Sequence, residues 1–400
     1  MSTNVEGLLL EGLKVLDLSQ GIAGPYCASI LLQQGADVVK VEPPAGDWAR
    51  GTRGARDGFS PVVIAYNAGK RGLCIDAGKP DGRAVLARIA AQVDIVIQNF
   101  RPGVADRLGL GYDTLKQHNP GLIYLSISGF GTEGPYVKLP ATDGVMQAMT
   151  GMMVANRDAD GTPRRIGLYL ADIAAAMYGS QLISAALYRR ALGKPGTGGR
   201  HLQVTLLETC AALQACNILE SAMQNASGQA PAAAGPPTAP SGIFRTADGL
   251  LMLSALDDAM FERTAKAIGR TDWISDSRFS TTALRLAALD ELHAGVAEQL
   301  ALASTAQWQT RLTEADVLHG RVNNYAEFLA DPATVQAGLF APVEQAGIGV
   351  MPAARHPDSV RMTLGAAPAI GEHTVDILQQ FGYAAHEIDD LLQRKIAIAR

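Results

Sequence analysis

The residues best suited to chemistry in this chain are two aspartates, Asp143 and Asp172, which stand 29 positions apart. Asp143 follows a marked stretch at residues 128–135, which reads Ser-Gly-Phe-Gly-Thr-Glu-Gly-Pro and comes after a predicted strand. Asp172 stands at the head of an apolar segment that is predicted to be a helix. A helix N-terminus favours an ionised carboxylate, and a nucleophilic carboxylate must be ionised. Asp172 is therefore the candidate catalytic residue.

Asp172 also fits a structural role, as the N-cap of that helix. Aspartate is a preferred capping residue, and the residues after Asp172 make a good first helical turn. Spacing alone favours the cap, and the two roles are compatible. The seven histidines are scattered and form no nucleophile or metal motif, so the sequence supports neither Ser-His-Asp chemistry nor a metal site.

Two glycine patterns raise a nicotinamide cofactor as an alternative. Residues 129–134 spell GxGxxG after a predicted strand, but Pro135 and Pro140 prevent the helix that this fingerprint needs. Residues 21–24 offer a better first turn, with Glu42 where a ribose-binding acid would stand, although the third glycine is missing. Lone glycine patterns often match by accident, so we do not expect this cofactor.

Basic residues gather in the N-terminal quarter of an acidic chain. Residues 99–107 follow directly after the strand predicted at 94–97, and α/β sheets bind ligands at the C-terminal ends of their strands. Arginine suits phosphate there, because its planar fork makes bidentate contacts. For any single basic residue, a solvated surface position is the favoured interpretation. The gathered residues are Arg50, Arg53, Arg56, Lys70, Arg71, Arg101 and Arg107.

Composition places the chain among soluble globular enzymes. A chain of 400 residues is too long for a single hydrophobic core, so two or more domains are expected, and 48% of its residues are apolar. The net charge of −5 gives no general attraction for nucleic acid or anionic membrane. The first 20 residues lack a secretory signal, which predicts a cytoplasmic protein. Residues 166–188 are apolar enough to suggest a membrane span, but Asp172 and Gln181 favour a buried core helix. The four cysteines lack metal-ligand spacing, so we expect buried thiols.

The order of strands and helices predicts a Rossmann-like open parallel sheet. Strands are expected at residues 13–19, 36–41, 94–97 and 122–127, with helices at 24–34 and 81–92. A large α/β domain should therefore fill residues 1–200, followed by a long amphipathic linker helix over 201–225.

A smaller α+β domain is predicted over residues 226–330. It opens with a Pro- and Ala-rich tract at 226–242, which cannot form regular structure. A hairpin turning at Asp248-Gly249 follows, and then helices near 258–268, 284–301 and 305–315. The last part, residues 331–400, is helical toward its end and has no core of its own.

At this point the chain resembles the family III CoA-transferases, which include formyl-CoA transferase and carnitine CoA-transferases. The resemblance extends along almost the whole chain, and the order and spacing of its motifs make chance agreement implausible. The matching stretches are 13–18 with 23–25, 35–44 with Gly46, Asp47 and Arg50, 67–71, 99–109, Asn119-Pro120, 128–135, Asp143, Asp172, 247–249 and 371–374.

The resemblance implies a CoA-transferase that uses acyl-CoA and carboxylic acid substrates and no permanently bound cofactor. Asp172 matches the family's catalytic aspartate, which attacks an acyl-CoA thioester to form a mixed anhydride and then an enzyme–CoA thioester. Because water must be excluded from such intermediates, a mobile cover is expected, and the tract at 226–242 lies where the family has a glycine-rich loop. A plain linker fits that tract equally well. Arg164 or Arg165 is a candidate for holding a second carboxylate of the acid.

The positions that the resemblance implies for CoA binding are Ile22, Ala23, Ile75, Asn99, Phe100, Arg101, Arg107, Leu108 and Thr142. Arg107 is the expected phosphate contact. Formyl-CoA transferase has Gln where Ile22 stands and Arg where Pro43 stands, which puts oxalate as acceptor and one phosphate contact in doubt.

The same fold also serves 2-methylacyl-CoA racemases, which remove and return an α-proton with paired Asp and His residues. Their His stands immediately before the residue matching Asp143, where this chain has Thr142. A threonine hydroxyl cannot take up a proton near neutral pH, so the racemase alternative is disfavoured. The resemblance further implies an interlocked homodimer in which residues 331–400 return to the large domain.

Overall fold

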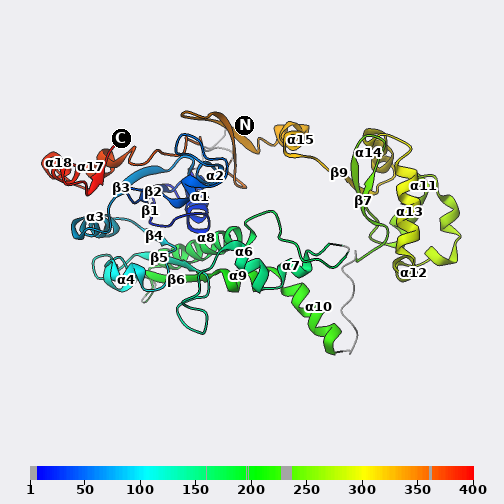
Figure 1. Cartoon of the computed structure of the whole chain (residues 1–400), viewed down its shortest axis with the longest axis horizontal. Coiled ribbons are helices and arrows are strands. Elements are labelled where there is room, and N and C mark those ends of the chain that lie inside the picture. Colours follow the sequence, from blue (N-terminus) through cyan, green and yellow to red (C-terminus); the bar gives the residue numbers. More distant parts are fainter. Residues whose placement is uncertain (1–6, 159, 195, 197, 227–236, 360–362) are drawn as a thin grey trace. The chain divides into compact units, whose positions relative to one another are not determined.

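The computed structural model describes residues 7–158, 160–194, 196, 198–226, 237–359 and 363–400. These residues form two compact units (Figure 1). The first contains both ends of the chain, Met1–Met223 and Gln336–Arg400, and the second contains the middle, Gln224–Val335. The C-terminal part of the chain thus belongs to the same unit as the N-terminal half.

The first unit is built on one sheet of seven strands among the described residues, in the order β12-β3-β2-β1-β4-β5-β6. Every neighbouring pair is parallel except β12 and β3. The fold is therefore mixed α/β with a predominantly parallel sheet. The strands are β1 Lys14–Asp17, β2 Asp37–Glu42, β3 Arg71–Ile75, β4 Ile95–Gln98, β5 Ile123–Ser128, β6 Arg200–Thr205 and β12 Ala397–Ile398.

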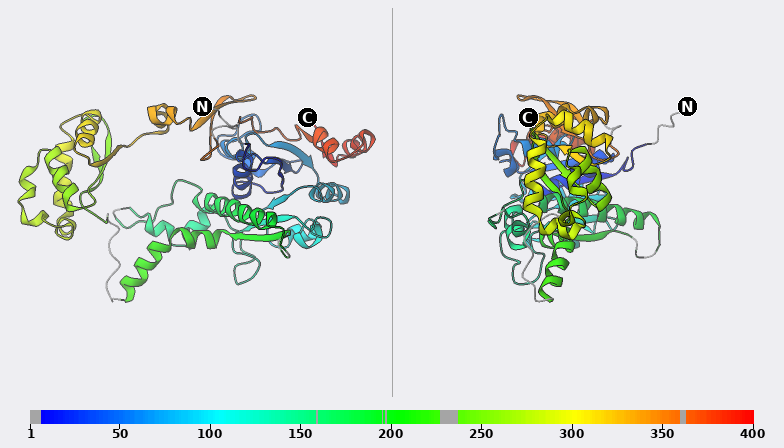
Figure 2. Two further views of the ribbon diagram at one scale, coloured as in Figure 1. Left: turned by 180° about the vertical axis from the view of Figure 1, so that it is seen from behind. Right: turned by 90° about the vertical axis from the view of Figure 1, so that its right-hand side faces the viewer.

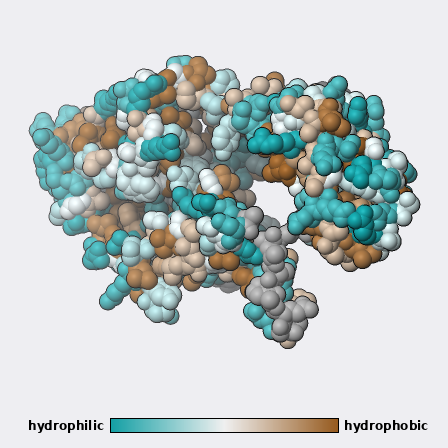
Figure 3. Space-filling model, turned by 45° about the vertical axis from the view of Figure 1, so that its right-hand side comes forward, coloured by the Kyte–Doolittle hydropathy of each residue, from teal (hydrophilic) through white to brown (hydrophobic). Residues whose placement is uncertain are grey.

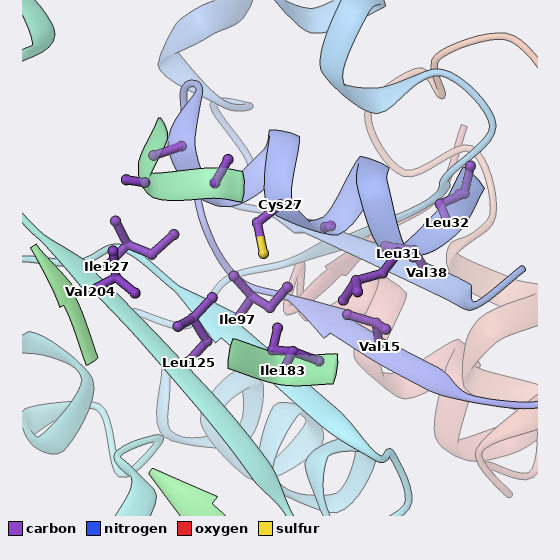
Figure 4. Packing of buried hydrophobic residues seen from close by; sticks show 14 of the residues in the cluster. Val15, Cys27, Leu31, Leu32, Val38, Ile97, Leu125, Ile127, Ile183 and Val204 are labelled. Atoms are coloured by element: carbon purple, nitrogen blue, oxygen red, sulfur yellow. The ribbon is translucent and has the colours of Figure 1, made fainter. Parts of the chain in front are cut away.

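Helices cover both faces of this sheet because side chains along each buried strand alternate between the faces. On one face, α1 and α8 pack on Val15, Ile97 and Leu125 (Figure 4). On the other face, α3, α17 and α18 pack on Leu16 and Tyr124. The unit's helices are α1 Ala23–Gln33, α2 Pro61–Asn67, α3 Pro80–Ala90, α4 Val104–Arg107, α5 Tyr112–Leu115, α6 Asp143–Met149, α7 Met152–Ala155, α8 Leu170–Ala191, α9 Leu206–Leu213, α10 Ala215–Ala226, α17 Thr374–Gln380 and α18 Ala385–Gln393, with a 3-10 turn, η1, at Trp48–Gly51. The hairpin β10 Phe340–Gln345 and β11 Gly349–Ala354 completes it.

The helix α8, visible as the long helix in Figure 2, is long and apolar enough by length and composition alone to cross a membrane. Its small residues instead pack inward. A Cβ atom on Gly179 would lie 2.8 Å from Leu125 and 3.3 Å from Cys27, so glycine allows α8 to lie close to both the sheet and α1. One face of α8 is therefore packed in the core as expected, whereas Met177 and Tyr188 on the helix remain exposed, so the buried core helix is confirmed only in part.

The linker helix expected over residues 201–225 was wrong in its first part. Residues Arg200–Thr205 form β6, which pairs with β5 as the edge strand of the sheet, and only then do α9 and α10 follow. The stretch misled because alternation in a strand and periodicity in a helix overlap over short apolar segments. The strands β3 and β12 were also not predicted.

The second unit has its own core and a three-stranded antiparallel sheet, β7-β8-β9. The hairpin expected at Asp248-Gly249 is confirmed, since β7 pairs with β8 on either side of it. The helix expected over 284–301 is instead two helices, α12 and α13. The elements are β7 Ser241–Arg245, β8 Leu250–Ser254, α11 Asp258–Ala267, η2 Thr271–Ile274, η3 Ser277–Phe279, α12 Thr282–Ala287, α13 Leu289–Leu300, α14 Thr305–Glu314, β9 Leu318–Arg321, α15 Tyr325–Ala330 and α16 Pro332–Gln336, whose last residue belongs to the first unit.

The four cysteines are all free thiols. Cys27, Cys74 and Cys210 are buried, as expected. Cys216 is exposed, which corrects the expectation, because α10 has no buried residue against which its thiol could pack.

Candidate active site

Asp172 lies in the first turn of α8, as the third residue of the helix. Its expected role as the N-cap is wrong: the helix begins two residues earlier, and its N-cap, Tyr169, makes no side-chain capping bond. The backbone N–H of Ala171 instead donates to Oδ1 of Asp143 at 2.9 Å. Asp143, which lies on α6, thus accepts one of the free backbone N–H groups in the first turn of α8. Asp172 does not cap the helix and is available for a different role.

The carboxylate of Asp143 is fully engaged. The side chain is buried, and its Oδ2 accepts hydrogen bonds from Gln147 Nε2 at 2.8 Å and from Arg165 at 3.0 Å. Together with Ala171, these donors occupy both oxygens, so Asp143 holds the start of α6, the Arg165 segment and α8 together. Because both oxygens already have donors and the side chain is only 3% exposed, Asp143 is not accessible to a substrate.

Asp172 has the opposite surroundings. Its side chain is partly buried, and no residue in the described part of the chain donates a hydrogen bond to its carboxylate. Burial raises the pKa of this carboxyl to about 7, the negative charge of Asp143 adds to the rise, and Arg165 opposes it. Although a helix N-terminus favours the ionised form, burial outweighs it here, so the Asp172 carboxyl is only partly ionised near neutral pH. A carboxylate without hydrogen-bond donors is a stronger nucleophile than a solvated one.

Tyr66 of α2 lies close enough to Asp172 for the carboxylate charge to contribute to the raised pKa of its phenol. Burial raises the pKa of the Tyr66 phenol to about 12, with smaller contributions from Tyr26, Asp172 and Tyr169. The hydroxyl therefore stays protonated and can act as a hydrogen-bond donor beside Asp172. The Tyr66 ring also lies against Tyr26 of α1, with centroids 5.0 Å apart, so it links Asp172 to the helix that carries Ile22 and Ala23.

The turns after β1 and β4 are joined by Asn99. Its side chain accepts from the backbone N–H of Gln20 at 2.8 Å and donates to the Gln20 carbonyl at 2.7 Å. The predicted CoA positions Ile22, Ala23, Asn99 and Phe100 are thus brought together at the C-terminal edge of the sheet. The side-chain amide of Asn99 is already engaged in these two hydrogen bonds with Gln20.

Buried ion pairs stabilise the turns at this edge of the sheet. Asp47 accepts from the backbone N–H of Gly21 at 3.0 Å and pairs with Lys40 at 2.9 Å. Lys70 pairs with Asp17 at 2.8 Å, with both side chains fully buried. Lys70 is therefore a structural residue, and its membership of an exposed basic cluster was wrong. Its partner in that pair is distant in sequence, which the sequence pattern did not show.

Glu42 and Arg50 form a second pair of this kind. Arg50 donates to both oxygens of Glu42, at 2.7 and 2.6 Å, and both side chains are buried. Glu42 is consequently not free to bind a ribose, and no helix follows the glycines at 129–134 until Thr142 caps α6. Neither part of the nicotinamide alternative finds support.

The two arginines that follow β4, Arg101 and Arg107, are not paired in this way with any described residue. Arg101 and Arg107 are exposed, and neither side chain has a hydrogen-bond or ion-pair partner in the part of the chain that the structure describes. Both guanidinium groups are available for phosphate. Phe100 and Leu108, from the same loop, are partly buried against the core on the α3 side of the sheet.

Three other predicted CoA positions have little exposed side chain. Ile22 and Ala23 are buried at the start of α1, and Ile75 is buried at the end of β3, two strands away from β1. A ligand at this edge could therefore meet these residues through their backbone groups. The last predicted position, Thr142, is exposed and caps α6.

Thr142 lies next to Asp143, at the place where a racemase would need its second base. Its hydroxyl accepts from the backbone N–H of Val145 at 3.5 Å, as an N-cap does. Since a hydroxyl in this position cannot exchange a proton with a substrate near neutral pH, the racemase alternative is not favoured.

Two side chains near the site were missed in the sequence. Tyr66 stands directly before the motif at residues 67–71, which was its only signal. Trp48 was missed as well: its ring packs over Gly21, whose φ is 79°, and more than half of it is exposed. The two arginines before Asp172 are already paired, Arg164 with Asp158 and Arg165 with Asp143.

Comparison with known proteins gives one consistent result. The sequence pattern of CoA-transferase family III matches residues 10–374. A succinate–glutarate CoA-transferase from Agrobacterium fabrum is 32% identical over 391 residues, covering 93% of this chain and 95% of the relative. An acetyl-CoA:oxalate CoA-transferase from Acetobacter aceti is 34% identical over 337 residues, covering 82% of this chain and 84% of the relative.

Solved structures agree with these sequence matches. A CAIB/BAIF family protein from Brucella suis superposes with a TM-score of 0.81 at 31% identity, covering 94% of this chain and all of the other. The mixed α/β fold and its motifs thus occur together in one family of enzymes. This chain therefore belongs to CoA-transferase family III and is an acyl-CoA:carboxylate CoA-transferase.

Proposed function

We propose that this enzyme moves CoA from an acyl-CoA to a carboxylic acid through a covalent thioester on Asp172. The observation that carries the proposal is the contrast between the two acids. Asp143 has every oxygen engaged by donors, whereas Asp172 is partly buried and has no donor among the described residues. Only Asp172 can offer its oxygens to a substrate.

Each step of this reaction balances. An oxygen of Asp172 attacks the thioester carbonyl carbon, the carbon–sulfur bond breaks, and CoA leaves as the thiolate with a mixed anhydride on the enzyme. The thiolate then attacks the Asp172 carbonyl carbon, releasing the donor carboxylate and leaving the Asp172–CoA thioester. The acceptor carboxylate repeats both steps in reverse. No group has to transfer a proton, which fits a site without a paired base.

The surroundings of Asp172 support this chemistry in two ways. Partial burial limits hydration of the carboxylate, which lowers the cost of bringing it to a carbonyl carbon. The protonated Tyr66 hydroxyl is a donor for an oxygen that becomes negative during the attack. We propose Tyr66 as that donor, and Arg107 with Arg101 as the contacts of the CoA phosphates, together with the other positions named above.

A mobile cover is expected because both covalent intermediates would hydrolyse in water, and the sequence leaves the tract at 226–242 open as either that cover or a plain linker. Residues 227–236 of this tract lie outside the described residues.

The experiment that tests the function is a transfer assay with isotope-labelled CoA and two acids. We expect label to move from one acid to the other without net hydrolysis, and Asp172→Ala to abolish the transfer. An Asp172→Ala enzyme that kept full activity would overturn the mechanism. Asp143→Asn is the informative comparison, because it should weaken folding more than chemistry.

We further propose that the enzyme acts as an interlocked homodimer in the cytoplasm. Apolar side chains remain exposed along α8, α9 and α10, and α10 has no buried residue at all. Such faces on one chain are typical of an interface. Figure 3 shows hydrophobic residues at the surface among hydrophilic ones. The exposed residues of these helices include Met177, Tyr188, Leu213, Ile218, Leu219 and Met223.

Light scattering after size-exclusion chromatography tests the dimer. The wild-type chain should elute with twice the mass of one chain, and Leu219→Lys with Met223→Lys should shift it toward aggregates or monomers. Ser221→Lys, at an exposed polar position of the same helix, is the matched control. A monomeric wild-type protein with full activity would contradict the proposal.

A further inference from the structure

A large cavity opens beside the start of α8, entirely within the first unit. Its volume is about 650 Å³, which lies within the range of small-molecule binding pockets. Its walls come from α1, from residues 54–66 including α2, from α8, and from the hairpin segment 348–357 near the other end of the chain. The lining residues are Tyr26, Gly54, Arg56, Phe59, Ser60, Pro61, Ile64, Ala65, Tyr66, Ile173 and 348, 351–357.

The cavity is connected to the proposed nucleophile through two of its walls. Ile173, which lines it, directly follows Asp172 in the chain. Tyr66, which also lines it, is close enough to Asp172 for the carboxylate charge to act on its phenol. An acyl group whose carbonyl carbon met Asp172 would therefore have this space beside it.

Most of the wall is apolar and aromatic. The Tyr26 ring lies 5.0 Å from the Tyr66 ring and 5.3 Å from the His356 ring, centroid to centroid, so three rings form one side. Ile64, Ile173 and Phe59 add aliphatic and aromatic surface. Such walls bind a hydrocarbon body by removing it from water.

The charges that line the cavity are all positive. Arg56 and Arg355 contribute guanidinium groups, and none of the lining residues is an aspartate or a glutamate. Burial lowers the pKa of His356, so its ring adds no charge at neutral pH. An apolar space lined by Arg56, whose guanidinium forms no ion pair in the described part of the chain, fits an acid that has a second anionic group.

Arg56 is the cation best placed to hold that group. One of its terminal nitrogens donates to the Ile348 carbonyl at 2.8 Å, and it forms no ion pair in the described ranges of the chain. The remaining N–H donors of its fork are available for a carboxylate. By contrast, Arg164 and Arg165 are already paired with Asp158 and Asp143, so they are poorer candidates for this role than the sequence suggested.

We propose that this cavity binds the body of a dicarboxylic acid, or of its CoA ester, and that Arg56 holds the carboxylate that does not react. The inference rests on the proposed function, because it assumes that the reacting carboxyl group meets Asp172. It makes Arg56 a specificity-determining residue and names the substrate class as an acid with an apolar chain between two carboxylates.

Adipate and hexanoate test this proposal, because they share one carbon chain and differ in the second carboxylate. With glutaryl-CoA as the common donor, the wild-type enzyme should show the higher kcat/KM for adipate. Arg56→Met should reduce that preference by about 10- to 100-fold, the effect expected from losing a charge-assisted hydrogen bond. The loss should come mainly from KM for adipate, with hexanoate little changed. Arg56→Lys, which keeps the charge without the fork, should recover part of the preference.

Arg88→Met is the matched control. Arg88 also joins the N-terminal half to the C-terminal segment through a backbone carbonyl, that of Gly382, but it lies at the end of α3, away from the cavity. The Arg88→Met variant should leave the ratio of kcat/KM for adipate to kcat/KM for hexanoate unchanged. A wild-type enzyme that prefers hexanoate, uses neither acid, or keeps its preference after Arg56→Met would overturn the proposal.

Trapping of the Asp172 adduct separates this result from the mechanism. Whether or not Arg56→Met loses its selectivity for adipate, the variant should still form the Asp172 adduct with its donor. Loss of the adduct in the wild-type protein would instead overturn the proposed function itself.

Discussion

The Asp143 carboxylate accepts a hydrogen bond from the backbone N–H of Ala171 at 2.9 Å, and so it satisfies the start of α8 from a different helix. This bond assigns separate roles to the two acids that stand out in the sequence. Asp143 positions the helix, and Asp172, one residue after Ala171, is carried into the site without a hydrogen-bond donor.

Removing Asp143 should therefore destabilise the fold. Asp143→Ala leaves the Ala171 N–H without its acceptor and removes one acceptor each from Gln147 and Arg165, and an unsatisfied buried donor costs about 1–3 kcal/mol. We expect the free energy of unfolding to fall by about 2–4 kcal/mol in urea denaturation. Asp158→Ala removes an exposed partner of Arg164 and should cost less than about 1 kcal/mol. Equal losses for the two variants would contradict this assignment.

Asp172 should have the opposite effect on stability. Its pKa rises from 3.8 to about 7 on folding, so its cost is absent below about pH 4, grows with pH and is complete above about pH 7. That shift corresponds to about 4 kcal/mol, and partial exposure of the carboxyl reduces the expected effect to about 2 kcal/mol.

Asp172→Asn should accordingly unfold at higher urea than the wild type at pH 8 and at the same urea at pH 4. Protein concentration must be held constant because the enzyme is proposed to be a dimer. Asp389→Asn, at an exposed position, is the control and should change neither value. A destabilised Asp172→Asn protein at pH 8 would show that the carboxylate has a structural partner after all.

The rate should depend on ionisation of Asp172. Because the nucleophile must be charged, kcat/KM for the acyl-CoA should rise with pH through about 7 and then level off. Arg165 lowers the pKa of Asp172, so Arg165→Gln should move this rise to higher pH. The measurement is a pH profile of kcat/KM for both proteins. A profile that is flat from pH 5 to 9, or a shift to lower pH in the variant, would argue against Asp172 as the titrating group.

Tyr66 should act through its hydroxyl group. Tyr66→Phe keeps the ring contact with Tyr26 but removes the donor, and loss of one donor to a developing oxyanion costs about 10²–10³ in kcat. We expect a fall in kcat within that range with little change in thermal stability. Tyr26→Phe, on the same aromatic wall, should have a smaller effect. Unchanged kcat in Tyr66→Phe would leave the ring with a packing role alone.

The first half of the fold could be predicted because its signals are local. Apolar runs bounded by turn residues marked β1, β2, β4 and β5, and Gly24-Pro25 marked the start of α1. Asp143 and Asp172 could be singled out in the same way, since both stand beside motifs. What these residues do could not be read locally, because the bond from Asp143 to Ala171 joins two different helices.

Long-range partners account for the other differences. Lys70 was placed with the exposed basic residues because its partner, Asp17, is 53 positions away and on another strand. The cavity beside Asp172 could not be predicted because segment 348–357 closes it from the opposite end of the chain. The strand β6 was hidden within a stretch whose apolar pattern also suits a helix.

The most direct test of the account is chemical trapping of the covalent intermediate. The enzyme is incubated with its acyl-CoA donor, treated with borohydride or hydroxylamine, and digested for peptide mass spectrometry. We predict a modified Asp172 in the wild-type protein and none in Asp172→Asn, with Asp143 unmodified in both. Full transfer activity with no adduct, or an adduct on any other residue, would contradict the proposal that Asp172 carries CoA.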